Sequence, residues 1–297
     1  MDKTRALGEE NKAKLFTMRV FAYLFLIFVA VLSLFSFYLL IINSTRSHAE
    51  LQAGFTLVPS ANFINNFNAA LYGYDASLIN IPTGMFNSLV IAISSSILGV
   101  YFSAMTAYAV HVYDFRLKKF TFNFIMMVMM IPTQVSIVGF VQMVNGLKLG
   151  QTFWPLIIPA IAAPATFFYM RQYMQSALPL EIVEAARVDG SNEFRTFNFI
   201  SLPMMRPAMA VQLIFAFVAS WNNYFTPALI LGYSTSKGDT RTLPIMIATL
   251  KSIQNSQDAN LGAVYMMIML SILPVVLVYL LVSKNIVGGV ALGAVKG

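Results

Sequence analysis

Long apolar runs without a charged residue alternate with short polar segments along most of this chain. Six runs of this kind can be read: 20–42, 85–110, 120–144, 153–170, 207–232 and 261–283. An apolar stretch of about 18 or more residues is a candidate for a helix that crosses a bilayer. The pattern therefore predicts an all-α integral membrane protein, with six transmembrane helices in one domain over 20–283.

Prolines interrupt the third and fourth runs. Pro132 lies inside the third, and Pro155, Pro159 and Pro164 lie inside the fourth. A proline removes a backbone hydrogen bond from a helix, and membranes tolerate such breaks where other protein satisfies the freed groups. We expect the third run to be interrupted at Ile131-Pro132, and the fourth to be a kinked or partly broken helix packed against other protein.

The distribution of Lys and Arg predicts the orientation. If the amino terminus is cytoplasmic, the inside segments are 1–19, 111–119, 171–206 and 284–297. These carry fourteen of the 19 Lys and Arg residues, and the outside segments of the same total length carry five. Cytoplasmic loops are enriched in cations. We therefore expect a multi-pass protein of the plasma or inner membrane with a cytoplasmic segment at each end, 1–19 and 284–297.

Composition excludes a typical soluble domain. Hydrophobic residues make up 58% of the chain, charged residues only 10%, and the mean hydropathy is +0.71, whereas a soluble domain has roughly 25% charged residues. The net charge of +7 is spread over short loops and forms no basic face of the kind that binds nucleic acid.

The sequence offers no catalytic or ion-coupling site. It has no cysteine, its two histidines, His48 and His111, are far apart, and no glycine-rich phosphate loop is present. All charged residues lie outside the six runs, whereas an ion-coupled carrier usually has ionisable groups within the membrane. We expect a chain that is not an enzyme, binds no metal or other cofactor, and takes its driving energy from another subunit.

The most polar long segment between two runs, 179–207, predicts two short helices. Pro179 suits the start of the first, and Asp189-Gly190 suits a sharp bend in which Gly190 is left-handed. Ser191 is expected to cap the second helix, which should stop at Leu202-Pro203.

An apolar face is expected on the first of these helices, formed by Ile182, Ala185, Ala186 and Val188. By pattern alone, the stretch is equally consistent with an amphipathic connector on the membrane surface. A short rigid helix between two spans could also act as a handle that moves both.

The full spelling of this stretch resembles the EAA loop of binding-protein-dependent ABC importer permeases. The matching residues are Glu184-Ala185-Ala186, Asp189-Gly190, Phe197, Ile200, Leu202-Pro203 and Pro207. In that family the loop is a cytoplasmic helix-turn-helix that docks into a cleft of the ATP-binding subunit. The resemblance implies that coupling is carried by Glu184, Ala185, Ala186, Asp189, Gly190, Leu202 and Pro203.

Individual roles follow from the same resemblance. Glu184 would pair with a basic residue of the ATP-binding subunit, and the two alanines would permit close approach. We expect Asp189 to shape the turn. The other charged residues, Glu181, Glu193, Arg187 and Arg195, are expected to form a solvated helix surface.

The fifth run contains Trp221-Asn222-Asn223-Tyr224-Phe225 with Pro227, which resembles a pattern of the sugar-transporting members. There the second Asn is usually an acid, so a role that needs a carboxylate is in doubt. Rings and amides suit a sugar path, for which the candidates are Gln134, Asn222, Asn223 and Tyr224. The alternative is that the aromatic rings anchor the chain at the membrane interface.

Further matches, among them Asn87-Ser88-Leu89, Ile131-Pro132 and the terminal Gly-Ala-Val-Lys-Gly, resemble the maltose/multiple-sugar branch of this family. That resemblance implies a carbohydrate importer built with a second homologous permease, two ATP-binding subunits that use ATP and Mg²⁺, and an extracytoplasmic sugar-binding protein. Segments 291–297 and 233–260 would reach the ATP-binding dimer and the sugar-binding protein. The alternatives are an ABC importer permease for another solute and a self-contained secondary transporter; the sequence does not identify the sugar.

Overall fold

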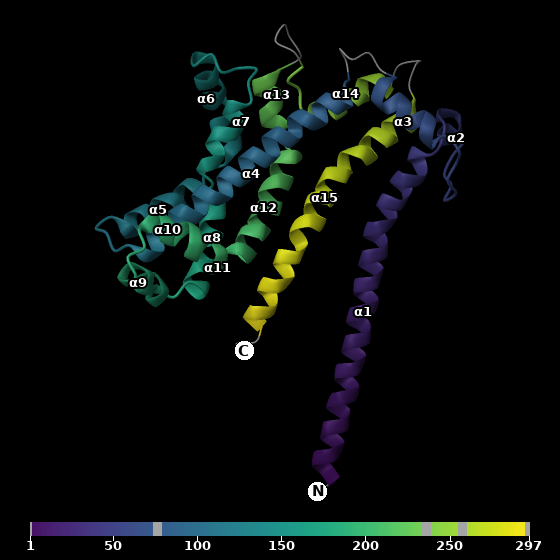
Figure 1. The fold of residues 1–297 in the computed structure, drawn as a ribbon. Helices are drawn as coiled ribbons and strands as arrows, with labels where there is room; N and C mark the ends of the chain where they lie inside the picture. The colour runs from purple at the N-terminus through teal and green to yellow at the C-terminus, as the bar shows by residue number, and fades with distance from the viewer. Residues whose placement is uncertain (1, 74–78, 233–238, 255–259, 295–297) are drawn as a thin grey trace. The chain divides into compact units, whose positions relative to one another are not determined.

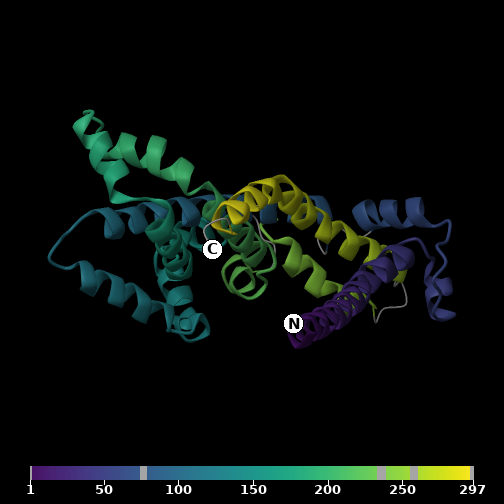
Figure 2. The same cartoon turned by 90° about the horizontal axis from the view of Figure 1, so that it is seen from below.

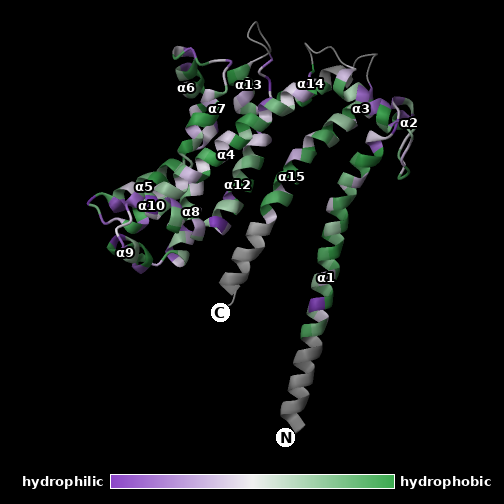
Figure 3. Ribbon diagram, viewed as in Figure 1, coloured by the Kyte–Doolittle hydropathy of each residue, from purple (hydrophilic) through white to green (hydrophobic). Residues whose placement is uncertain are grey.

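The computed structural model of this chain describes residues 2–73, 79–232, 239–254 and 260–294, and all regular secondary structure in these ranges is helical (Figure 1). Three helices are long and apolar enough to cross a membrane, over Leu15–Ser44, Ile81–Val112 and Leu261–Ser283. They belong to α1 (Asp2–Ser44), α4 (Ile81–Val112) and α15 (Leu261–Ala294). Hydrophobic residues predominate along the part of α1 whose side chains are described (Figure 3). The prediction of an all-α membrane protein is therefore confirmed for the described residues.

The other predicted runs are broken helices. The third is α5 (Lys118–Met129) followed by α6 (Thr133–Gly146), with a bend of 94° at Pro132. The fourth is divided at its prolines into α7 (Trp154–Ile157), the 3₁₀ helix η1 (Ile158–Ile161) and α8 (Pro164–Ala177). The expected breaks at proline are confirmed.

The fifth run departs from the expected continuous helix. It divides into α12 (Arg206–Trp221) and α13 (Phe225–Leu231). The break falls on the polar residues before Phe225, where Asn223 Oδ1 accepts a hydrogen bond of 3.3 Å from the Thr226 amide and so begins α13. Asn residues favour such local bonds over a continuous helix.

The chain divides into two compact units, Met1–Ala70 with Gln254–Met269, and Leu71–Ile253 with Leu270–Gly297. The first unit contains α1, α2 (His48–Gln52), most of α3 (Phe63–Tyr72) and the start of α15. Its centre is the buried Asn66, whose amide donates to the carbonyls of Ser44 and Arg46 at 2.8 Å each. Gly262 lies directly against these groups.

The second unit is organised around α4, which packs along α12 and α8 (Figure 2). The Asn80 side chain caps the helix start, Pro82 stands in its first turn, and no proline lies further inside. Small residues line its buried side, and a Cβ at Gly99 would lie 3.0 Å from the Ala160 carbonyl oxygen. Small residues allow membrane helices to approach closely, so α4 is held over its full length.

The amino-terminal part of α4 holds the segment that leads into α14 (Leu243–Gln254). Asn87 donates to the backbone carbonyls of Asp239 and Arg241 at 2.9 Å each, and Ser88 accepts from the Leu243 amide at 2.9 Å. The Arg241 side chain, nearly fully buried, pairs with Asp239 at 2.8 Å. Asn87 and Ser88 thus fix the backbone of 239–243.

Replacing Asn87 by Leu should destabilise this unit. The change leaves the buried Arg241 carbonyl and the partly buried Asp239 carbonyl without their donor, at a cost of about 1–3 kcal/mol for a fully buried unsatisfied group. We expect a lower midpoint of thermal unfolding in detergent for Asn87→Leu than for Asn123→Leu, since Asn123 is exposed on α5. Equal midpoints would contradict the anchoring role.

Candidate functional site

The predicted helix pair is present. It consists of α9 (Leu180–Val188), which begins after Pro179, and α10 (Glu193–Thr196). Between them Gly190 has φ +80°, in the left-handed region. The Ser191 amide donates to the Ala186 carbonyl at 2.9 Å, and the Gly190 amide donates to the Arg187 carbonyl at 3.0 Å. These bonds form a Schellman motif, which explains why glycine is needed at this bend.

Two details of the prediction are wrong. The cap of α10 is Asn192, whose side chain accepts from the Arg195 amide at 2.8 Å, whereas Ser191 Oγ accepts from the Thr196 hydroxyl. The Schellman motif uses Ser191 to close α9, which moves the cap one residue on.

The second helix also continues past Leu202-Pro203. A π-helical turn over Phe197–Ser201 leads into α11 (Leu202–Met204), and the chain breaks at Met205, where it turns by 81° into α12. Pro203 stands in the first turn of α11, where a missing amide proton is tolerated, so it does not end the helix.

The helix pair is bound to α4 through three polar contacts. The Tyr108 hydroxyl donates to Glu193 Oε2 at 3.0 Å, and the Tyr101 hydroxyl donates to Asn198 Oδ1 at 3.1 Å. His111 Nε2 lies 3.0 Å from the Leu178 carbonyl, just before α9. Sequence spacing gave no signal for these contacts, because the partners lie 67 to 97 residues apart.

Glu193 and Arg187 do not form the purely solvated surface that was expected. The Arg187 Nε donates to Glu193 Oε1 at 2.7 Å, and the guanidinium lies 5.6 Å from the centre of the Tyr113 ring. Burial, and then the hydrogen bond with Glu193, raises the pKa of the Tyr113 hydroxyl. These groups tie the bend between α9 and α10 to the end of α4. Glu181 and Arg195 are exposed, as expected.

The predicted apolar face of α9 is only partly buried, because Ala186 packs inward whereas Ile182, Ala185 and Val188 do not. Val183 and Ala186, which are 1% and 5% exposed, form the buried side of α9. Val183 belongs to a hydrophobic core cluster of the second unit. Ile182 and Val188 face outward, at 36% and 88% exposed. The predicted helix is confirmed, but the two sets of apolar residues lie close together on it, and the sequence pattern does not distinguish the set that packs inward.

The outward side of α9 therefore carries an open face, which we call the docking face: Ile182, Glu184, Ala185, Val188, Asp189 and Gly190. It combines small side chains, apolar contacts and two carboxylates on one rigid turn. Of the candidate coupling residues, Ala186 lies beneath this face and Leu202 and Pro203 are half-buried. The last two line a separate hollow of about 410 Å³ with Asn198 and Arg206.

The Trp221–Tyr224 cluster contains both buried and exposed residues. Trp221 is 3% exposed, stacks on Phe217 at 5.8 Å and donates from its indole to the Ser271 carbonyl at 3.1 Å. This contradicts interfacial anchoring for Trp221. Asn222 and Tyr224 are exposed, and Tyr224 lines a hollow of about 210 Å³ with Phe225, Leu229 and Ile245. Asn222, Asn223 and Gln134 are not among the residues that line this hollow.

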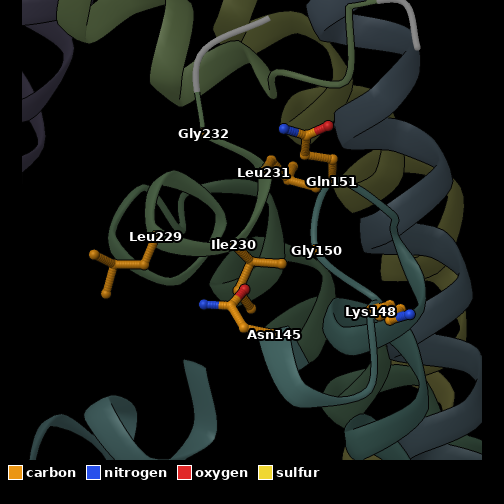
Figure 4. A pocket seen from close by; sticks show the side chains of 8 residues that line it. All are labelled: Asn145, Lys148, Gly150, Gln151, Leu229, Ile230, Leu231 and Gly232. Atoms are coloured by element: carbon orange, nitrogen blue, oxygen red, sulfur yellow. The ribbon is translucent and has the colours of Figure 1, made fainter. Parts of the chain in front are cut away.

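Another hollow, of about 310 Å³, lies beside the hollow at Tyr224 and shares Leu229 and Gly232 with it (Figure 4). Its polar lining comes from Asn145 at the end of α6 and from Lys148 and Gln151 in the turn that follows. Lys148 and Gln151 have φ of +56° and +61°, an uncommon conformation for residues with a side chain. The backbone is held by the Gln151 amide, which donates to the Ile230 carbonyl at 3.1 Å. This hollow could not be predicted from the sequence, because no glycine marks either left-handed position.

No cluster of three or more metal-binding side chains occurs in the part of the chain that the structure describes. The exposed docking face, its attachment to α4, and the two hollows near α13 are candidate functional features.

Comparisons with known proteins show what this chain is similar to. The family described as "Binding-protein-dependent transport system inner membrane component" matches residues 99–286. The arabinooligosaccharides transport system permease protein AraQ of Halalkalibacterium halodurans is 34% identical over 279 residues, which cover 91% of this chain and 94% of that protein. The lactose transport system permease protein LacG of Rhizobium radiobacter is 27% identical and covers 90% of this chain and 92% of its own length.

Similarity extends beyond sugar systems. The sn-glycerol-3-phosphate transport system permease protein UgpE of Pectobacterium atrosepticum is 28% identical over 91% of this chain and 95% of that protein. A solved bacterial ABC transporter involved in the import of the acidic polysaccharide alginate has a chain with a TM-score of 0.71 and 21% identity, covering 90% of this chain and 96% of that one. This last likeness concerns the fold.

Proposed function

Since the chain belongs to the family of binding-protein-dependent transport system inner membrane components, we propose that it forms half of the translocation pathway of an ATP-driven carbohydrate importer. The observation that carries the coupling role is the docking face on α9, which is open to a partner and joined by hydrogen bonds to the membrane-spanning α4. A force applied to this face is transmitted to α4 rather than absorbed by a loop.

The proposed topology has six crossings, with both termini and the α9–α10 pair in the cytoplasm. The broken pairs α5–α6 and α12–α13 and the α7–η1–α8 segment supply the three crossings beyond α1, α4 and α15. The excess of Lys and Arg in the cytoplasmic segments supports this orientation.

Coupling then proceeds through rigid-body motion. Two ATP-binding subunits, which hold ATP and Mg²⁺, would bind the docking faces of this chain and of a second, homologous permease. Closure of those subunits would pull α9 and α10, and Tyr101, Tyr108 and His111 would carry the displacement to α4. Glu184 would pair with a cation of the ATP-binding subunit, while Ala185 permits close seating.

A carbohydrate substrate is supported by the names of the arabinooligosaccharide and lactose relatives and by the aromatic hollow at Tyr224. A ring face can cover the apolar side of a sugar, and amides can bind its hydroxyls. An extracytoplasmic binding protein would deliver the sugar near the end of α13. The proposed contact segments 233–260 and 291–297 lie partly outside the described residues, at 233–238, 255–259 and 295–297.

The decisive experiment is uptake by the reconstituted four-subunit complex in proteoliposomes, in the presence of its binding protein. ATP is supplied on the side of the membrane that carries the ATP-binding subunits. We expect ATP-dependent accumulation of an oligosaccharide and none of glycerol-3-phosphate, an amino acid or a peptide. Transport of one of the latter would support the alternative, an importer of another solute. Uptake driven by an ion gradient without ATP would favour a secondary transporter.

Tyr108→Phe tests the route from the docking face to α4. The variant loses a hydrogen bond to a charged acceptor, an interaction worth about 1.5–3 kcal/mol. We expect ATP hydrolysis to continue while the sugar transported per ATP falls severalfold. Tyr169→Phe is the matched control, because Tyr169 is 57% exposed on α8. An unchanged ratio in Tyr108→Phe would exclude this contact from coupling.

A further inference from the structure

The loop that follows α2 turns back along the flank of α1. It comprises residues 53–59 and is seen in Figure 1 descending beside the carboxyl-terminal part of α1. The Tyr38 hydroxyl donates to the Leu57 carbonyl at 2.7 Å. Tyr38 stands six residues before Ser44, the last residue of α1, which places this contact about 9 Å back along the helix. The loop therefore reaches the depth of the apolar span Leu15–Ser44.

The outward side chains of this loop are apolar. Phe55, Leu57 and Val58 are 73%, 46% and 67% exposed. The one residue among 53–59 with a polar side chain, Thr56, accepts a hydrogen bond of 3.2 Å from the Val58 amide. Three large apolar side chains at the tip of a seven-residue loop would be unfavourable in water.

The base of the loop is held by a charged network. The Arg46 guanidinium donates to the carbonyls of Glu50 and of Gly54, the latter at 2.8 Å. The Glu50 carboxylate in turn accepts from the Ser47 amide at 2.7 Å and from the Ser60 hydroxyl at 2.8 Å. The loop conformation is thus fixed by the protein itself, and its Gly54 and Leu57 carbonyls are already paired.

We propose that loop 53–59 is a lipid anchor, which inserts Phe55, Leu57 and Val58 among the acyl chains of the leaflet around the carboxyl end of α1. Hydrocarbon accepts non-helical backbone only where protein satisfies its polar groups, and the contacts at Gly54 and Leu57 satisfy two carbonyls of this loop. The neighbouring side chains of α1 at this depth, Phe37 and Ile41, are apolar and exposed as well. In the proposed topology this leaflet is the outer one.

The absence of cysteine from the whole chain allows a direct test. Single variants Phe55→Cys and Val58→Cys, each carrying a nitroxide label, are prepared in the complete importer reconstituted in lipid nanodiscs. Ala61→Cys is the matched control, because Ala61 is exposed beside the polar base of the loop. Accessibility is measured by power saturation with oxygen, which enters lipid, and with a water-soluble nickel chelate, which does not.

We expect the labels at 55 and 58 to be relaxed by oxygen and protected from the nickel chelate, and the label at 61 to show the reverse. Access of the chelate to 55 and 58 at the level of 61 would place the loop in water and overturn the proposal. Protection from both reagents would indicate cover by another protein, such as the second permease. Protection that appears only after the binding protein is added would make the loop a docking surface instead; both results also overturn the lipid anchor.

Discussion

Ala185→Trp should abolish ATP-driven uptake while leaving the protein folded in the membrane. Ala185 is exposed on the docking face, so the protein itself has room for an indole at this position. A cleft of the ATP-binding subunit that contacts Ala185 closely has no space for an indole side chain. We expect retention of the ATP-binding subunit to weaken by at least about a hundredfold, which corresponds to about 2.8 kcal/mol. The measurements are sugar uptake and recovery of the ATP-binding subunit with the purified permease.

Two variants make this result interpretable. Ala185→Ser keeps the small volume and should retain both uptake and the subunit. Ala186→Trp places the same large side chain at the buried neighbouring position, 5% exposed, and should reduce the amount of folded protein instead. If Ala185→Trp keeps the complex and its uptake, the α9–α10 pair is a surface connector, and the coupling proposal is wrong.

Gly262→Ala should disrupt the first unit of the chain. An added Cβ would fall on the Arg46 carbonyl oxygen and lie 2.5 and 2.6 Å from the two amide atoms of Asn66. Those are the groups that join the end of α1 to α3, and backbone cannot move aside as a flexible side chain can. Overpacking typically costs about 1–3 kcal/mol, and we expect the upper end of this range where backbone must shift.

The expected result for Gly262→Ala is a lower yield of folded protein and an unfolding midpoint reduced by several degrees in detergent. Gly139→Ala on α6 is the control, since its added Cβ meets nothing within 4 Å and the change removes a flexible residue from a helix. A midpoint for Gly262→Ala equal to that of Gly139→Ala would show that the close approach of α15 to Asn66 is not structurally required.

The sequence predicted the features that depend on local chemistry. The apolar runs, the breaks at Pro132 and in the fourth run, and the left-handed Gly190 each follow from neighbouring residues, and all are present. The candidate coupling residues were singled out because the sequence of 184–207 resembles the EAA loop, and their coupling role stays a prediction. Local chemistry did not determine the finer details. The cap of α10 is Asn192 and not the predicted Ser191, and Pro203 lies within a helix that it was predicted to end.

Long-range contacts could not be predicted, because nothing in the pattern pairs residues that are far apart. The contacts of Tyr108 with Glu193 and of Asn87 with Asp239 are of this kind. So is the choice of Val183 over Ile182 for the buried side of α9, since both are apolar and only the surface opposite decides between them. The left-handed Lys148 and Gln151 were missed for another reason: they lack the glycine by which such positions are usually recognised.

The attachment of α4 at both ends has a thermodynamic consequence. Asn87 holds the segment 239–243 near the start of this helix, and His111 contacts the entrance to α9 near its end, about 36 Å away along the helix axis. Linkage requires that two sites joined through one body affect each other by the same factor. If nucleotide at the ATP-binding subunits changes the affinity for the extracytoplasmic binding protein, that protein must change nucleotide affinity equally, so each side of the membrane reports its occupancy to the other.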